Sequence, residues 1–145
     1  MSYLVNDDFE RTKNLVFALS KARNLVAAEL EAGLNDVGIN VQQLGVLVAL
    51  ARGNASTPAE LSKLLGVNPG RMTRVLDEME RSALVQRSRN GNDRRVVDVA
   101  LTPEGRRTAA LSGQIVSTVR IRRLSRFTTS EFDVLSALLC KLLDA

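Results

Sequence analysis

Apolar residues recur every three or four positions along most of the chain, a period that predicts amphipathic helices. In the first such segment, residues 9–34, one helix face carries Leu15, Leu19, Ala22, Val26 and Leu30. Further apolar residues widen this stripe beyond what one partner helix requires. The pattern predicts later helices over 41–51, 58–66, about 69–81, 103 to about 126, and 129–143.

Polar residues mark where these helices begin. Thr57-Pro58, Asn68-Pro69 and Thr102-Pro103 each combine a capping side chain with a Pro that suits the first helical position. Capping boxes are predicted for Asn40 with Gln43 and for Thr128 with Glu131. Gly66 ends one helix three residues before the next begins, so the pair indicates a helix-turn-helix.

The buried faces of that helix pair follow from the same spacing. The first helix is expected to bury Leu61, Leu64 and Leu65. The second is expected to bury Met72, Val75, Leu76 and Met79.

A β-hairpin is predicted after the helix pair. Residues 84–87 form the first expected strand and 95–101 the return strand, with Asn90-Gly91 as a strong turn signal between them. Residues 55–56 are too short to define an element and could add a small third strand. The fold class is therefore mainly α with a small β-hairpin wing.

Composition narrows the functional classes. A chain of 145 residues indicates one domain, or one domain with an oligomerisation extension. Aromatic residues make up 3%, which argues against stacking platforms for single-stranded nucleic acid. The net charge is +4, with Arg supplying most of the cations, and Arg makes bidentate contacts to phosphate and guanine. A basic protein with no polyanionic partner remains the alternative on charge alone.

Cysteine and histidine content excludes several chemistries. The chain has no His and one Cys, Cys140, which we expect to be a small buried hydrophobe. This excludes His-based triads, leaves too few ligands for zinc, and fits a reducing compartment. The first ten residues are polar and acidic, unlike a signal peptide, and no apolar run approaches the roughly 20 residues of a membrane span. We expect a cytoplasmic protein with no metal, cofactor, catalytic residue or membrane partner.

Two basic surfaces suggest contact with duplex DNA. The exposed start of the helix at about 69–81 presents Pro69, Arg71, Thr73 and Arg74, and a helix of this width fits the major groove. The hairpin carries Arg87, Arg89, Arg94 and Arg95, and Asp93 could hold the Arg95 guanidinium in a fixed direction. Arg at such a tip suits a narrow minor groove. Each surface, taken separately, is also compatible with an ordinary solvated face.

A family resemblance rests on four segments together. They are Thr57 to Leu61, Leu64 to Val67, Thr73 to Asp77, and Asp93-Arg94-Arg95 through Leu101-Thr102-Pro103-Glu104-Gly105. In this combination the chain resembles the MarR family of bacterial transcriptional regulators. The resemblance implies a winged helix-turn-helix homodimer. Its expected parts are an N-terminal dimerisation helix (1–40), a winged helix-turn-helix lobe (41–102) and C-terminal dimerisation helices (103–145).

The resemblance also implies residue roles. The helix at about 69–81 would read the major groove and the wing at about 87–97 would enter the minor groove, with Arg95 at its tip and Asp93 as its orienting carboxylate. The expected DNA-binding residues are Pro69, Arg71, Thr73, Arg74, Arg89, Asp93, Arg94 and Arg95. A twofold dimer would recognise a pseudo-palindromic operator with half-sites about 34 Å apart. The implied function is that of a repressor relieved by a small-molecule effector, whose pocket the sequence does not mark.

The chain departs from the family pattern just before the wing. The family usually has Gly there, where this chain has Ser82-Ala83-Leu84. Any left-handed backbone strain would then fall on Ala83, at a cost on the order of 1 kcal/mol. The reactive Cys that the redox-sensing branch carries near its N-terminus has no counterpart in this chain.

Two other functional classes compete with DNA binding. A winged-helix module that binds an acidic protein instead of DNA would show the same Arg surface. An enzyme has little support, because the sequence contains no nucleophile motif, no glycine-rich phosphate loop and no paired carboxylates at a plausible cleft.

Overall fold

The computed structural model describes residues 2–144 of the chain, with side chains described from residue 7 onward. Its elements follow in the order α1 (Ser2–Leu34), a 3-10 turn (Asn35–Val37), α2 (Val41–Ala51), α3 (Pro58–Leu65), α4 (Pro69–Arg81), β1 (Val85–Arg89), β2 (Val97–Leu101), α5 (Pro103–Val119), a π-helical segment (Arg120–Leu124) and α6 (Thr129–Leu143). The expected mainly α fold with a β-hairpin wing is confirmed.

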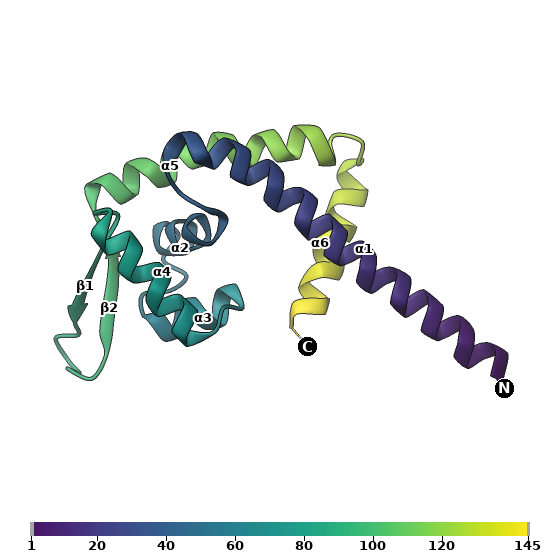
Figure 1. Cartoon of the computed structure of the whole chain (residues 1–145), viewed down its shortest axis with the longest axis horizontal. Helices are drawn as coiled ribbons and strands as arrows, with labels where there is room; N and C mark the ends of the chain where they lie inside the picture. Colours follow the sequence, from purple (N-terminus) through teal and green to yellow (C-terminus); the bar gives the residue numbers. More distant parts are fainter. Residues whose placement is uncertain (1, 145) are drawn as a thin grey trace.

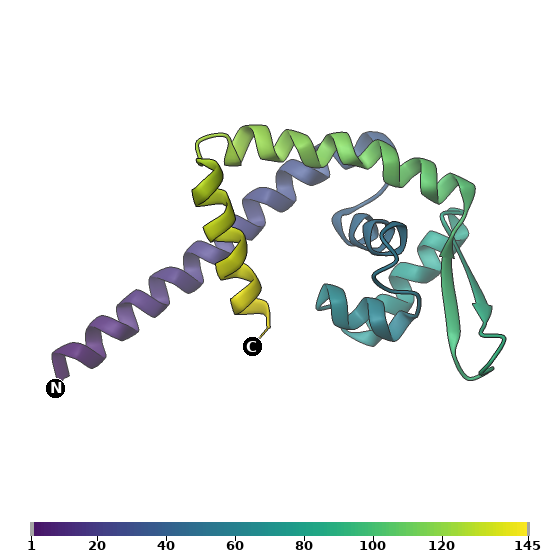
Figure 2. The same cartoon turned by 180° about the vertical axis from the view of Figure 1, so that it is seen from behind.

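The elements form a lobe and an extension (Figure 1). The lobe contains α2, α3, α4 and the antiparallel β1–β2 pair, whose register joins Val85 to Leu101 and Arg89 to Val97. Helices α1 and α5 pack on each other above the lobe and carry the chain away from it. Figure 2 shows the start of α1 at the end of the molecule opposite the hairpin, and α6 between that end and the lobe.

The hydrophobic core lies in the lobe. It includes the fully buried residues Leu34, Val46, Leu47, Leu61, Leu76 and Met79. Burying one such side chain contributes about 1.5–3 kcal/mol to folding. Helix α6, in contrast, contains no buried residue.

Capping residues set the helix boundaries as the sequence predicts. Asn40 and Gln43 form the expected capping box, with the Gln43 N–H donating to Asn40 Oδ1 at 2.9 Å and the Asn40 N–H donating to Gln43 Oε1 at 3.0 Å. Thr128 and Glu131 form the second box. Gly66 ends α3 in the left-handed conformation at φ 64°.

Three sequence-based expectations are wrong in detail, and the third strand that the sequence left open at residues 55–56 does not form. Helix α1 begins at Ser2 and not at residue 9. Leu61 is buried as expected, but Leu64 is 51% exposed and Leu65 is only partly buried, while Ser62 is buried. Residues 55–56 form no strand and make one backbone bond, from the Val99 N–H to the Ser56 carbonyl at 2.7 Å. Cys140 is exposed and not buried.

The strands are also shifted, and β2 is shorter than expected. β1 begins one residue later than expected and extends through Arg89, while β2 begins at Val97 and not at residue 95. The loop between them therefore spans 90–96. The Val96 N–H donates to the Asp93 carbonyl at 3.0 Å within the loop, so this donor is not available to the opposite strand.

A strained corner joins α4, the wing and α5. Ala83 has φ 60°, which confirms the left-handed strain expected there. The Leu84 N–H donates to the Met79 carbonyl at 2.9 Å, which closes the end of α4. The Thr102 hydroxyl donates to the Ala83 carbonyl at 2.5 Å, and the Thr102 N–H donates to the Leu84 carbonyl at 3.1 Å. A Cβ on Gly105 would lie 2.0 Å from the Leu84 oxygen, so only glycine allows this approach.

Within residues 2–144, no single helix combines the length and apolar composition that a membrane crossing needs. Residues 7–37 and 41–51 meet the criteria only as a pair bent by 78°.

Candidate nucleic-acid interface

Helix α4 presents a basic N-terminal end. Asn68 caps it, with Oδ1 accepting a 2.8 Å bond from the Arg71 N–H, and Pro69 occupies the first turn. Met72, Val75, Leu76 and Met79 face the core as expected. This leaves Arg71, Thr73 and Arg74 exposed on the opposite side.

The exposed side chains of α4 differ in which of their hydrogen-bonding groups remain free. The Thr73 hydroxyl donates to the Pro69 carbonyl at 3.0 Å, so its lone pairs remain open to an outside donor. Neither Arg71 nor Arg74 forms an ion pair with any residue that the structure describes. Both guanidinium groups are therefore available to an external anion.

The wing tip holds Arg95 in one direction while leaving it open to solvent. Asp93 Oδ1 accepts from the Arg95 backbone N–H at 3.0 Å and from its Nε at 3.1 Å, and Oδ2 accepts from Nη2 at 3.3 Å. The Arg95 side chain is nevertheless 91% exposed. Hydrogen bonds from the Arg95 side chain, and then from its backbone, lower the pKa of the Asp93 carboxyl below its ordinary value.

The remainder of the loop is braced from within. Asn90 Oδ1 accepts bonds from the N–H groups of Asn92 (2.8 Å) and Asp93 (3.2 Å). Arg89 Nη1 donates to the Arg94 carbonyl at 2.8 Å, so part of the Arg89 guanidinium supports the loop. The Arg94 side chain is exposed and forms no ion pair with a described residue.

Arg87 has a role that the sequence did not reveal. It was counted among the basic residues of the hairpin, but its Nη2 lies 2.6 Å from Asp77 Oδ1 and its Nε lies 2.8 Å from Glu80 Oε2. These bonds, with Glu80 the larger contributor, raise the pKa of Arg87 above its ordinary value. Arg87 therefore ties β1 to α4. The sequence does contain an indication of this pairing, because Asp77 and Glu80 lie three residues apart and therefore on one side of α4.

The helix and the hairpin meet at one hollow. A cavity of about 410 Å³ is lined by Pro58, Thr73, Arg89 and Val97, among others. The start of α3, the exposed face of α4 and the base of the wing thus form one continuous surface. The tip residues Asp93, Arg94 and Arg95 extend it along the hairpin, which projects beside α4 (Figures 1 and 2). Such a surface, with one helix and one Arg-tipped hairpin, matches the two grooves of a duplex.

Comparisons with known proteins agree with this geometry. The model of the MarR family matches residues 37–96, from the start of the lobe to the wing. The multiple antibiotic resistance protein MarR of Escherichia coli (strain K12) is 31% identical over 135 residues, which are 90% of this chain and 94% of that protein. The HTH-type transcriptional repressor MdtR of Bacillus subtilis (strain 168) is 31% identical over 80 residues, 55% of this chain, and the match spans only about half of MdtR (52%). The crystal structure of a mutant MarR from E. coli complexed with operator DNA superposes with a TM-score of 0.81, at 30% identity over 93% of this chain and 97% of that chain.

Proposed function

This chain belongs to the MarR family of transcriptional regulators, and on that premise we propose that it is a dimeric, sequence-specific regulator that binds double-stranded DNA. One observation carries the proposal: Arg95 projects 91% exposed from the wing while both oxygens of Asp93 hold its guanidinium. A cation that is fixed in direction and largely exposed to solvent is suited to insertion into a groove. The similar MarR mutant, whose structure contains operator DNA, supports the assignment.

The proposed contacts divide between the two grooves. Residues 69–81 enter the major groove, where Arg71, Thr73 and Arg74 face base edges and Pro69 lies against the backbone. Residues 87–97 approach the minor groove, where Arg95 enters and Asp93 orients it. Arg94 is free for a phosphate, and Arg89 supports the loop from inside while its remaining donors face outward.

Dimerisation follows from the exposed apolar surface of the terminal helices. Helices α1 and α6 and the region between α5 and α6 expose large apolar side chains at Phe9, Leu15, Phe17, Ile121, Leu138, Leu142 and Leu143. Patches of this kind mark interaction sites. We place the twofold contact in segments 1–40 and 103–145, which leaves the lobe of residues 41–102 to each half-site. The operator is then pseudo-palindromic, with half-sites about one turn, or about 34 Å, apart.

We propose that the protein represses transcription and that a small-molecule effector relieves this repression. The relative MdtR is named a transcriptional repressor, which supports the first part. We do not propose a catalytic activity, because members of this family act as regulators. Binding to the chromosome would place the protein in the cytoplasm.

The DNA-binding proposal is tested with a random duplex library. Selection on the full chain yields a preferred duplex, whose affinity is then measured by fluorescence anisotropy at two salt concentrations. We expect a pseudo-palindromic consensus and an affinity that falls steeply with salt. Arg95→Ala should weaken binding on the order of tenfold, because a good groove contact contributes about 1–3 kcal/mol. Arg74→Ala should lower the ratio of specific to random binding. No enrichment at any salt would overturn the proposal in favour of a winged-helix module that binds an acidic protein without DNA.

The dimer is tested separately. Leu138 is 59% exposed in the single chain, so Leu138→Glu disturbs little packing within one chain. We expect this variant to sediment as a monomer and to lose affinity for the palindrome. The matched control is Ser136→Glu, two residues away on the same helix. Dimers that persist in Leu138→Glu would place the twofold contact elsewhere.

A further inference from the structure

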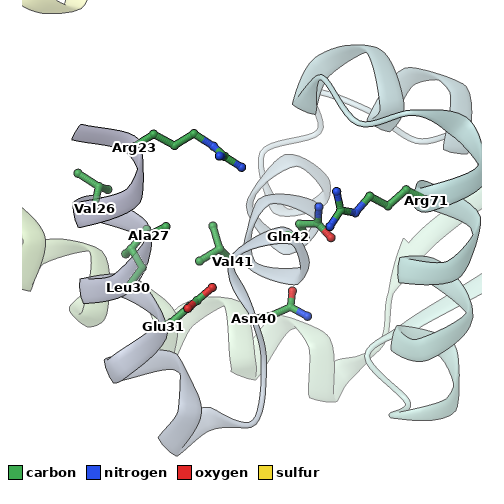
Figure 3. Close-up of a pocket in the computed structure, with 9 residues that line it drawn as sticks. All are labelled: Arg23, Val26, Ala27, Leu30, Glu31, Asn40, Val41, Gln42 and Arg71. Atoms are coloured by element: carbon green, nitrogen blue, oxygen red, sulfur yellow. The ribbon is translucent and has the colours of Figure 1, made fainter. Parts of the chain in front are cut away.

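The loop at the tip of the wing, residues 90–96, restrains its Arg more tightly than α4 restrains its own. Figure 3 shows Arg71 directed from α4 into a hollow of about 450 Å³, which Arg23 enters from α1. Neither of these Arg side chains forms an ion pair with a residue that the structure describes. Arg95, in contrast, lies against Asp93 although its side chain is 91% exposed. An exposed ion pair is usually weak, so Arg95 keeps one direction only if the loop holds Asp93 in place.

The side chain of Asn90 holds this loop through both of its polar atoms. Its Oδ1 accepts from the N–H of Asn92 at 2.8 Å and from the N–H of Asp93 at 3.2 Å. Its Nδ2 donates to both carboxylate oxygens of Asp98 on β2, at 3.0 Å to Oδ2 and 3.3 Å to Oδ1. The Asn90 backbone N–H also donates to the Val96 carbonyl at 2.8 Å. Asn90 therefore connects the return strand to the backbone of Asp93.

The partners on the two sides of the Asn90 side chain are of opposite kinds. Backbone N–H groups only donate and an ionised carboxylate only accepts, so the group between them must present both an acceptor and a donor. A primary amide does this, and these partners fix which of its ends is oxygen. Aspartate in place of Asn90 would turn a second carboxylate toward Asp98, and alanine would offer neither group. Both residues are half-buried in a hairpin tip that is otherwise largely exposed.

We propose that Asn90 is a positioning residue for DNA binding. Anchored by Asp98, it holds the backbone of Asp93, whose carboxylate directs Arg95 toward the minor groove. This inference rests on the proposed function, in which Arg95 enters that groove. Asn90 acts through Arg95 and makes no DNA contact of its own. Its contribution is to restrain the Arg95 guanidinium before DNA arrives, which lowers the conformational entropy lost on binding.

The loop is tested first without DNA, by amide hydrogen exchange measured on the full chain by NMR. The N–H groups of Asn92 and Asp93 should exchange more slowly than that of Arg94, which has no bonded partner among the described residues. Asn90→Ala should remove this protection. Gln86→Ala is the matched control, because it removes an exposed amide from the same strand and should leave the loop unchanged. Equal exchange in the two variants would overturn the bracing by Asn90.

The link to Arg95 is tested by anisotropy with the selected duplex. Asn90→Ala should raise the Kd severalfold, and Gln86→Ala should leave it unchanged. When Arg95→Ala is already present, adding Asn90→Ala should have almost no further effect, because both changes remove the same contact. An equal loss with and without Arg95 would overturn the positioning role. Failure of the unmodified chain to bind any duplex counts against the proposed function alone, because hydrogen exchange tests the loop without DNA.

The bond between Asn90 and Asp98 is tested by exchanging the two side chains. Asn90→Asp brings two carboxylates together and should raise the Kd on the order of tenfold. Asn92→Asp adds the same charge to the loop at a side chain that bonds to no described residue, so it measures the effect of charge alone. Combining Asn90→Asp with Asp98→Asn again places a donor opposite an acceptor at the original net charge, and it should return the Kd close to that of the unmodified chain. Equal losses in Asn90→Asp and Asn92→Asp, or no recovery in the combined variant, would overturn the anchoring by Asp98.

Discussion

Gly105→Ala tests the corner where α4, the wing and α5 meet. The added Cβ would lie 2.0 Å from the Leu84 oxygen and 3.0 Å from the Leu84 carbonyl carbon. Both are backbone atoms, so no side-chain rotation relieves the clash. The Leu84 carbonyl is also held by the Thr102 N–H at 3.1 Å. The start of α5 must therefore move away from the wing.

The cost follows from what this movement breaks. Overpacking a well-packed site costs about 1–3 kcal/mol, and loss of the bond between Thr102 and Leu84 adds about 1 kcal/mol. The better helix propensity of Ala returns up to about 1 kcal/mol. The net expectation is destabilisation by roughly 1–4 kcal/mol. Gly113 provides a matched control on the same helix, because its added Cβ would meet no described atom within 4 Å apart from its neighbours in the chain and the backbone of its own helix. Gly113→Ala should stabilise by up to about 1 kcal/mol.

The assay is urea unfolding followed by circular dichroism. All proteins are compared at one concentration, since unfolding of an oligomer depends on concentration. The two Gly→Ala variants should shift the unfolding midpoint in opposite directions. Equal midpoints, or a more stable Gly105→Ala, would refute the close approach and with it the physical reason for Gly at this position of the motif.

Three further outcomes are expected. Ala83→Gly should stabilise the chain by about 0.5–1 kcal/mol in the same unfolding assay, because glycine adopts the φ of 60° without a Cβ penalty; a loss of stability would contradict the strain. Asp93→Ala should weaken DNA binding severalfold in anisotropy although it removes a negative charge, because Arg95 loses its only restraint among the described residues; tighter binding would show that charge outweighs orientation. The pKa of Asp93 is lowered, so its contact with Arg95 is complete above the ordinary pKa and is lost as the pH falls through the lower one. A carboxyl ¹³C titration should therefore give a midpoint below the ordinary value that rises in Arg95→Ala, and equal midpoints would contradict the bond.

Capping residues in the sequence are sufficient to predict where most of the helices begin. Asn40, Thr57, Asn68, Thr102 and Thr128 each cap the helix that the sequence assigned to it. A cap satisfies backbone donors within three residues, so its effect can be read locally. The start of α1 has no such signal, and for that reason the helix was predicted to begin too late.

Contacts between distant segments could not be predicted in this way. Leu64 follows the apolar period of α3, but it lies beyond the edge of the core and remains 51% exposed. The ion pairs of Arg87 could not be predicted, because Asp77 and Glu80 are brought to it only by the packing of β1 on α4. The exposure of Arg71 and Arg74 could be predicted from the period of α4. That Arg71 shares a cavity with Arg23 depends on how α1 crosses the lobe.

Because α6 contains no buried residue, the amount of this protein in the cell should affect how strongly it controls its genes. A helix with no fully buried residue in its own chain gains most of its stability when a second chain covers it. Below the dissociation constant of the proposed dimer, the concentration of dimers rises with the square of the chain concentration. Occupancy of a two-half-site operator would then respond more steeply than linearly to the copy number of the protein. The cell could therefore adjust repression through the amount of chain that it makes, independently of any effector.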